Sequence, residues 1–286
     1  MVAAAPVVFV LLWSTGFIVA RYGTRDAGPL TFLFLRMVIA AGVLWAIAVA
    51  TNAPAISPTQ VKWAMLTGLG MHAIYLGGVF IASDLGLPSG VSALIAGLHP
   101  VVTSVGALLL LSEKLRPQQW IGVGCGLGGV VAVVIDRLNA GVSGITAGAV
   151  VAMVISVVGM SVGTLLQRSR GVTMPLLRGT AVQYMISAVV LGIGSVSVEH
   201  FEVRWTARFW WSLVWAVVVL SITAVLIMLW LLQRQAAVKV SSLFFLTPAL
   251  STIEGAVLFG ERLGVLAVLG LLVALLGVAL TTRQPT

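Results

Sequence analysis

The chain has 286 residues, of which 60% are hydrophobic and only 8% are charged. In soluble domains roughly a quarter of the residues are charged. Because 16 basic and 8 acidic side chains cannot give a folded chain of this size a charged surface, the composition excludes an ordinary soluble domain. It predicts a membrane protein whose surface is covered mostly by lipid.

Ten apolar segments follow one another along the chain, each near the roughly 20 residues that cross a bilayer as a helix. We place them near 3–20, 29–50, 63–83, 89–111, 119–135, 144–166, 175–195, 209–232, 239–260 and 264–282. Continuous apolar runs favour helices over the alternating strands of a membrane barrel. The sequence therefore predicts an all-α polytopic membrane protein with short loops and no soluble catalytic domain.

The formal net charge of +8 does not indicate nucleic-acid binding, because the basic residues stand singly or in pairs at the ends of spans. Eight loop Lys and Arg residues fall on the side that holds both termini and six on the other. Because cytoplasmic loops carry the excess of basic residues, we expect both termini in the cytoplasm and the protein in the bacterial inner (plasma) membrane.

One stretch of the sequence occurs twice. Residues 96–115, AGLHPVVTSVGALLLLSEKL, align without a gap with residues 244–263, FFLTPALSTIEGAVLFGERL, at an offset of 148. Pro100 corresponds to Pro248 and Glu113 to Glu261, and the register continues through the glycines of the following span. We therefore divide the chain into two related halves, 1–137 and 138–286.

Each half contains five predicted spans, so the second half must cross the membrane upside down relative to the first. Such inverted repeats form pairs whose interface opens to either side, with the substrate site near the midplane. The repeat therefore predicts a carrier that works by alternating access.

The repeated pattern is a mid-span proline, an apolar run, Gly/Ser-Glu-Lys/Arg-Leu and a glycine-rich final span. It resembles the EamA repeat of the drug/metabolite transporter (DMT) superfamily over essentially the whole chain. The segments LLWSTGFIVAR and PLTFLFLRMVIA are similar to the first two spans of that family. Within the family the chain looks like the YddG-type exporters, and this resemblance implies export of aromatic or other neutral amino acids.

Pro100 and Pro248 occupy equivalent positions within predicted spans, where proline removes a helical hydrogen bond. Such breaks survive in membranes where neighbouring helices or a wet cavity satisfy the freed backbone groups. We expect both spans to kink there and the two prolines to act as hinges.

Polar residues gather on one face of the spans that carry these prolines. His99 and Thr103 share a face of the fourth span, and Ser251 and Glu254 share the matching face of the ninth. An acid in the bilayer is costly, so we expect Glu254 to line a cavity or handle a proton. The alternatives are a packed polar contact and simple exposure nearer the membrane interface. We include His99, Ser251 and Glu254 among the candidate substrate-binding residues.

The third span places His72 and Tyr75 on a single face, where an imidazole and a phenol could meet the carboxylate or ring of an amino acid. The alternative for His72 is an ordinary contact between helices. Trp13 in the first span and Met160 in the sixth, each near a glycine, are expected to supply an apolar wall. These four residues complete the candidate substrate site.

Two further features have structural interpretations. Arg36 lies about two turns inside the second span, and we interpret it as part of a structural or gating pair rather than as a substrate contact. Gly124, Gly126 and Gly129 spell a nucleotide-binding pattern, but no strand precedes them. We interpret the pairs Gly122 with Gly126 and Gly124 with Gly128 as sites of close helix packing.

The alternative within the resembled family is a DMT-type carrier for another small metabolite or drug. The alternatives from other classes are a membrane enzyme, a channel and a receptor-like scaffold. The sequence contains no metal-ligand motif, no nucleophile motif and no paired aspartates, so we expect neither catalysis nor a cofactor or metal. The expected partners are a small-molecule substrate and the lipid bilayer, with no nucleic acid, and we expect a monomer.

Overall fold

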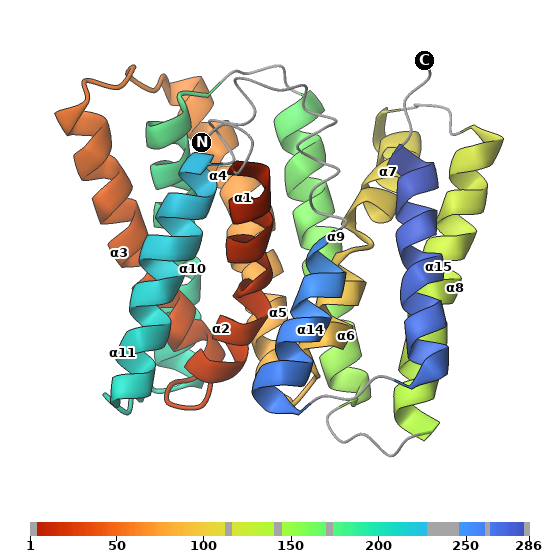
Figure 1. The fold of residues 1–286 in the computed structure, drawn as a ribbon. Helices are drawn as coiled ribbons and strands as arrows, with labels where there is room; N and C mark the ends of the chain where they lie inside the picture. Colours follow the sequence, from red (N-terminus) through yellow and green to blue (C-terminus); the bar gives the residue numbers. More distant parts are fainter. Residues whose placement is uncertain are drawn as a thin grey trace.

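The structure, a computed structural model, describes residues 5–111, 116–139, 145–169, 174–227, 246–260 and 264–282. Nearly all of these residues are helical (Figure 1). Within the described ranges the only β pairing is an isolated antiparallel bridge between Ala27 and Val203. The predicted all-α membrane fold is therefore confirmed.

The first half forms five helical units, several of them divided by a turn or a π-helical segment. They are α1 (Ala5–Ser14) with α2 (Gly16–Gly23); α3 (Pro29–Ala50); α4 (Pro58–Gly68), η1 (Leu69–Ile74) and α5 (Tyr75–Asp84); α6 (Ser89–Ala96) with α7 (His99–Leu111); and α8 (Pro117–Asn139). Proline in the first turn starts α3, α4 and α8, where its missing N–H costs nothing. The side chain of Ser57 also caps α4.

The described parts of the second half follow the same plan. They are α9 (Ala147–Ser169); α10 (Leu176–Val198); α11 (Ala207–Val214) with the π-helical η2 (Trp215–Ala224); α14 (Thr247–Phe259); and α15 (Val265–Thr282). The Thr206 hydroxyl accepts a hydrogen bond from the backbone N–H of Phe209 and so caps α11.

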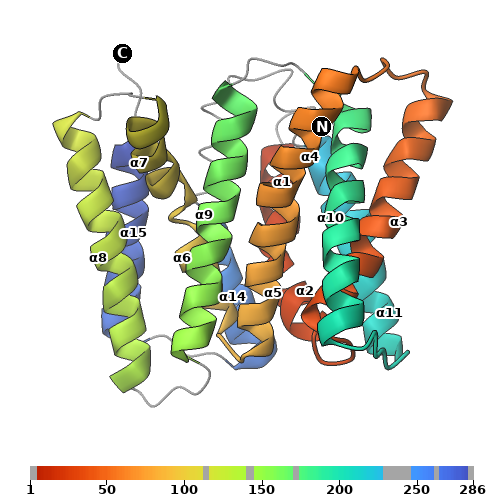
Figure 2. The same cartoon turned by 180° about the vertical axis from the view of Figure 1, so that it is seen from behind.

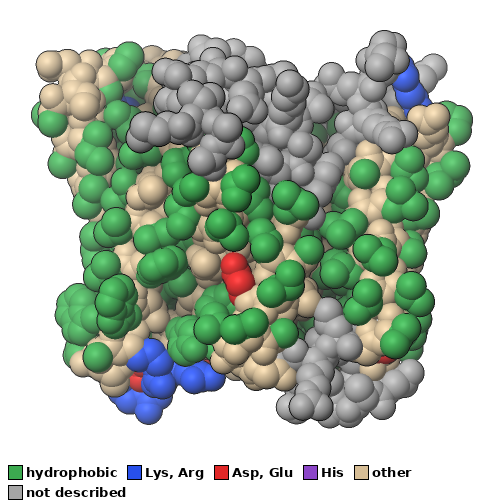
Figure 3. Space-filling view, viewed as in Figure 1, with side chains coloured by type: hydrophobic (Ala, Val, Ile, Leu, Met, Phe, Trp, Pro, Cys, Tyr) green, Lys and Arg blue, Asp and Glu red, His purple; other side chains and the backbone are tan. Residues whose placement is uncertain are grey.

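Eight helical stretches in the described ranges, some with a turn inside them, are long and apolar enough to cross a membrane, and α15 contributes a shorter apolar run, Val268–Leu280. These match the first eight predicted spans and the tenth, and α14 lies in the ninth. The end of the eighth span and the start of the ninth, within 228–245, lie outside the described residues, as do Glu113 and Glu261. Hydrophobic side chains are spread over the face of the molecule seen in Figure 3, as a lipid-facing surface requires.

The two halves are inverted relative to each other. α1 begins on the face of the molecule where α15 ends (Figure 1). α8 ends on the opposite face, and α9 begins there (Figures 1 and 2). Because the first half has an odd number of spans, the second half crosses the membrane upside down, as the sequence predicted.

The two halves repeat each other in secondary structure as well as in sequence. α7 and α14 start at His99 and Thr247 and end at Leu111 and Phe259, so both pairs of bounds differ by the repeat offset of 148 residues. π-helical segments occur in the third span of each half, as η1 and η2. Because π-helical turns are rare and often mark functional sites, their paired occurrence directs attention to these two spans.

The glycine-rich final spans of the two halves, α8 and α15, pack directly against each other. A Cβ added to Gly270 would lie 2.7 Å from the backbone oxygen of Gly129, and one added to Gly277 would lie 2.6 Å from that of Gly122. In the repeat Gly122 corresponds to Gly270 and Gly129 to Gly277, so the two contacts exchange under a pseudo-twofold rotation. Only glycine permits this approach of backbones.

The packing interpretation of the glycine run is correct for part of it. A Cβ added to Gly129 would meet α15, and one added to Gly126 would meet Leu98 and Val101 of the fourth span. A Cβ added to Gly124 or Gly128 would meet nothing within 4 Å. The proposed packing pair of Gly124 and Gly128 is therefore wrong, because successive glycines point in different directions around the helix and only one face meets a neighbour.

Pro100 does not bend a continuous helix, and the residues of the ninth span before Leu246 lie outside the described ranges. The fourth span is interrupted at Gly97 and Leu98, and Pro100 is the second residue of the new helix α7. Pro248 is likewise the second residue of α14. Proline is tolerated in a first turn because no helical carbonyl needs its missing N–H there. The interruption in the fourth span thus replaces the predicted kink.

The halves are joined by polar contacts on the face opposite the termini. The Glu199 carboxylate, after α10, accepts hydrogen bonds from the backbone N–H groups of Leu30 (2.9 Å) and Thr31 (2.8 Å). A carboxylate at a helix N-terminus satisfies free donors and complements the helix dipole. The first turn of α3 is therefore capped by a residue of the other half.

Candidate functional site

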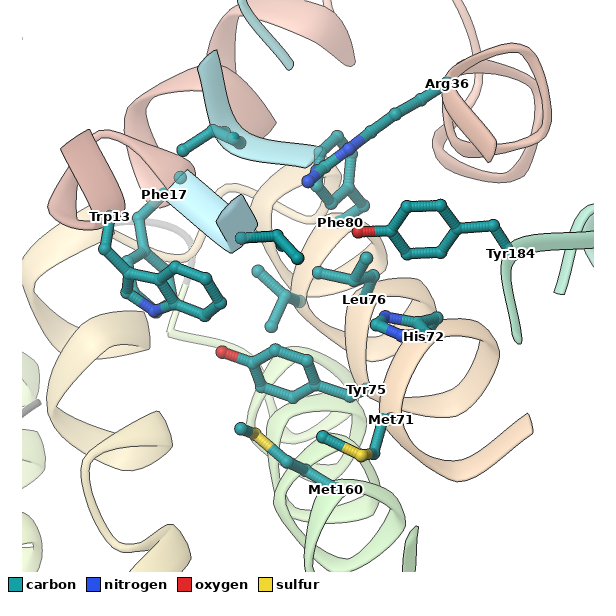
Figure 4. A pocket seen from close by; sticks show the side chains of 14 residues that line it. Trp13, Phe17, Arg36, Met71, His72, Tyr75, Leu76, Phe80, Met160 and Tyr184 are labelled. Atoms are coloured by element: carbon teal, nitrogen blue, oxygen red, sulfur yellow. The ribbon is translucent and has the colours of Figure 1, made fainter. Parts of the chain in front are cut away.

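A cavity lies between the two halves, with about 720 Å³ of space free of protein atoms, including its mouth. Its lining comes from the first three spans and from the sixth to eighth spans (Figure 4). The residues are Trp13, Gly16, Phe17, Arg36, Met71, His72, Tyr75, Leu76, Val79, Phe80, Met160, Tyr184, Leu220 and Val225. A mainly apolar lining with a few polar groups is typical of small-molecule sites.

The polar end of the cavity is built around Arg36. This side chain is buried inside α3, and its Nε donates a hydrogen bond to the hydroxyl of Ser221, 2.9 Å away in η2. The Tyr184 hydroxyl donates to the backbone carbonyl of the same Ser221 at 3.3 Å. The π-helical segment of the second half therefore holds two polar groups in place at the cavity wall.

A related contact holds His72 at the same wall. Its Nε2 lies 3.1 Å from Gln183 Oε1, an acceptor, so this nitrogen donates and the imidazole position is fixed by α10. The imidazole also meets the Tyr184 ring edge to face at 4.7 Å between centroids. His72 therefore makes a helix contact and also lines the cavity.

The hydrogen bonds of Arg36 and Gln183 are related by the repeat. Arg36 corresponds to Gln183 at an offset of 147 residues. Arg36 binds η2 of the second half, and Gln183 binds η1 of the first half. Each half therefore uses its second span to hold the π-helical segment of the other half.

Tyr75 has a fixed backbone and an available hydroxyl. Its carbonyl accepts a 2.7 Å hydrogen bond from Ser156 of α9, which ties the third span to the sixth. The Tyr75 side chain extends into the cavity between Trp13 and Met160 (Figure 4). Its hydroxyl makes no hydrogen bond to any of the described residues, so it is available to a bound solute.

The residues that the sequence selected fall into two groups. Trp13, His72, Tyr75 and Met160 line the cavity together. His99 does not line it: its Nε2 lies 3.2 Å from the hydroxyl of Thr164 on α9, a contact between helices. The remaining two candidates, Ser251 and Glu254, and both prolines also lie outside the lining.

Ser251 and Glu254 join α14 to α1. The Ser251 hydroxyl donates to the Ser14 carbonyl at 2.9 Å, and the Ser14 hydroxyl bonds to Glu254 Oε1. The second carboxyl oxygen of Glu254 is buried without a hydrogen-bond partner among the described residues. A partly satisfied acid at a contact between the first and ninth spans is well placed to respond to protonation.

Glu254→Gln should flatten the pH dependence of transport, because the amide cannot gain or lose a proton while it retains the size and a hydrogen bond to Ser14. Substrate flux measured in proteoliposomes between pH 6 and 8 checks this. Glu202→Gln, at an exposed loop acid, is the control and should keep the wild-type profile. A pH profile of Glu254→Gln identical to that of the wild type would contradict the expectation.

The sequence did not single out the cavity residues of the seventh and eighth spans, Tyr184, Leu220 and Val225. Two signals were available for them. Because the third span was selected, the repeat implied that the eighth span would face the same space. Tyr184 also directly follows Gln183, the repeat counterpart of Arg36.

The sequence profile of the EamA-like transporter family matches residues 2–135 and 147–283. The chain belongs to the EamA-like transporter family. It is therefore a multi-pass membrane transporter of the DMT superfamily, and the two matched segments agree with the two repeats seen in the fold. The EamA-like repeat thus accounts for nearly the whole chain.

Named relatives of this EamA-like chain are similar along nearly their whole length. The uncharacterized transporter YvbV of Bacillus subtilis is 26% identical over 96% of this chain and 89% of its own length. The uncharacterized inner membrane transporter YedA of Escherichia coli is 26% identical over 95% of this chain and 87% of its own length. A probable amino-acid metabolite efflux pump of Escherichia coli is 23% identical over 94% and 90%.

A solved crystal structure shares the fold, with a TM-score of 0.67 over 96% of this chain and 94% of the other at 21% identity.

Among the described residues no group of three or more His, Cys, Asp or Glu side chains is arranged to hold a metal ion.

Proposed function

We propose that this protein is a secondary transporter that exports aromatic or other neutral amino acids and related metabolites, without changing them chemically. The observation that carries the proposal is the cavity between the two halves, which combines a small polar end with aromatic and thioether side chains. The name of one relative, a probable amino-acid metabolite efflux pump, supports the same substrate class.

Alternating access between the inverted halves is the proposed mechanism. The cavity is lined by both halves, and each half holds the π-helical segment of the other, so movement of one half against the other would change access to the cavity. The interruption before Pro100 and the helix start at Pro248 are the proposed hinges. They lie beside the cavity spans rather than within the lining.

We further propose that the functional halves are 1–137 and 138–286, that the chain works as a monomer without a cofactor, and that both termini face the cytoplasm of a bacterial cell. The excess of loop Lys and Arg residues on the side of the termini supports this orientation.

Counterflow in proteoliposomes tests the function. Unlabelled phenylalanine or leucine trapped inside should accelerate uptake of the labelled amino acid, because a carrier returns faster when loaded. Equal uptake with and without trapped substrate would indicate an open pore. No uptake of any aromatic or neutral amino acid would contradict the proposed substrate class.

Tyr75→Phe should reduce uptake about tenfold, because loss of one hydrogen bond of roughly 1.4 kcal/mol to the solute is a tenfold change in affinity. The substitution removes only a hydroxyl that has no described protein partner, so folded yield should not change. Tyr22→Phe is the matched control, since Tyr22 packs on Phe259 outside the cavity lining. Equal uptake by both variants and the wild type would remove Tyr75 from the site.

A further inference from the structure

The charge of Arg36 is not balanced by any described protein group. Its side chain is buried in the cavity wall, and the hydroxyl of Ser221 is its hydrogen-bond partner. None of the six acids in the described ranges forms an ion pair with it; these are Asp26, Asp84, Asp136, Glu199, Glu202 and Glu254. A buried guanidinium without a counter-charge costs several kcal/mol, so such a group normally faces an anionic partner.

The lining supplies donors around Arg36 but no carboxylate. Arg36, Tyr184 and His72 lie at one end of the cavity, and Met71 and Met160 lie at the other (Figure 4). Only the Nε of Arg36 is engaged among described groups, which leaves the Nη groups for a ligand. A guanidinium is suited to bind a carboxylate through two parallel hydrogen bonds.

We propose that Arg36 binds the carboxylate of the transported solute, and that the cavity prefers a carboxylate with an apolar body and no ammonium group. This inference rests on the proposed function and narrows its substrate class. A monocarboxylate neutralises Arg36, whereas a zwitterionic amino acid brings an ammonium for which the lining has no acid. The deaminated form of an aromatic or branched amino acid is therefore the better ligand.

The other wall of the cavity fits the apolar body of such a solute. Trp13 and Phe17 come from the first span and Met160 from the sixth, so an aromatic or branched group would be enclosed by both halves. The ring faces also give an ammonium a weak alternative partner, so amino acids bind less tightly rather than not at all.

Equilibrium binding of three matched probes to the purified full-length protein tests the preference. Phenylpropanoate, phenylalanine and phenylethylamine share a ring and a short chain, and carry a carboxylate alone, both groups, or an ammonium alone. We expect phenylpropanoate to bind at least about tenfold tighter than phenylalanine, and phenylethylamine to bind weakest. Calorimetry in detergent avoids the passive leak of uncharged forms through vesicles.

Substitution of Arg36 tests its role directly. Arg36→Gln should weaken phenylpropanoate binding at least about tenfold and leave phenylethylamine binding unchanged or tighter, whereas Arg36→Lys should retain part of the affinity. Arg178→Gln is the matched control, because Arg178 lies in a span near Trp45 and does not line the cavity. The order of the wild-type affinities tests the proposal even if a variant does not fold.

Several outcomes would overturn the proposal. Phenylalanine binding as tightly as phenylpropanoate would contradict the charge preference while leaving amino acid transport intact. Unchanged phenylpropanoate binding by folded Arg36→Gln would contradict the role of Arg36. Absence of binding by all three probes, together with absence of amino acid uptake, would reject both this inference and the proposed function.

Discussion

Gly129→Ala should strongly destabilise the protein, because the new methyl group would lie about where the backbone of α15 runs. A Cβ at this position would be 2.5 Å from the backbone nitrogen of Ala274 and 2.8 Å from its Cβ. Overpacking of a side chain costs roughly 1–3 kcal/mol, and a helix backbone yields less easily than a side chain. We therefore expect a cost at the upper end of this range and a clearly lower melting temperature in detergent.

Gly128→Ala is the matched control for this prediction, since an added Cβ there meets nothing within 4 Å. Alanine also favours helix over glycine by about 1 kcal/mol, so this variant should be unchanged or more stable. Because of the pseudo-twofold relation, Gly277→Ala should behave like Gly129→Ala. Equal melting temperatures for the variants at 128 and 129 would argue against direct backbone packing of α8 and α15.

Asp26→Asn should weaken the contact between the two halves on the face opposite the termini and lower the melting temperature by several degrees. The buried Asp26 carboxylate accepts two hydrogen bonds from Arg208, each 2.7 Å long, and one of 2.8 Å from the Thr206 hydroxyl. Bidentate pairs of this kind are among the strongest polar contacts. Asparagine keeps the shape but loses the charge and one acceptor oxygen.

The same contact predicts a pH dependence. The hydrogen bond from Arg208 holds the pKa of Asp26 below its ordinary value, against the opposing effect of burial. A carboxyl whose pKa is lowered by folding stabilises the protein above about pH 4 and loses this contribution as the pH falls through the lower folded value. Melting curves should therefore show a larger difference between the wild type and Asp26→Asn at pH 7 than near pH 3.

Arg204→Ala is the control for the Asp26 prediction. The Arg204 side chain is 75% exposed, and its Nε lies 4.0 Å from the Asp26 carboxylate, so its loss should matter little. If Arg204→Ala were as destabilising as Asp26→Asn, the general positive charge of this loop region, rather than the Arg208 pair, would be responsible.

The sequence was sufficient for the spans and for the inverted repeat. A bilayer demands long apolar runs, and these are local properties that can be read residue by residue. The gapless match of Pro100 with Pro248 was likewise visible without coordinates. Since five spans per half is an odd number, the inversion followed from counting alone.

Only part of the candidate site could be predicted from the sequence. His72 and His99 are both span histidines on polar faces, yet His72 lines the cavity and His99 contacts Thr164 on α9. Periodicity indicates which residues of one helix share a face, but it does not say which neighbour that face meets. The same limit explains why Gly129 packs against α15 while Gly128 does not.

The sequence by itself thus determined the membrane class, the two inverted halves and the presence of buried polar residues, because each follows from hydropathy, spacing or self-similarity. Only the tertiary structure decided that Arg36, Tyr184 and His72 meet at one end of a shared cavity. The physical reason is that helix rotation and the choice of neighbour are set by packing across the two halves. Contacts such as Arg36 with Ser221 join residues 185 positions apart, beyond the reach of any local pattern.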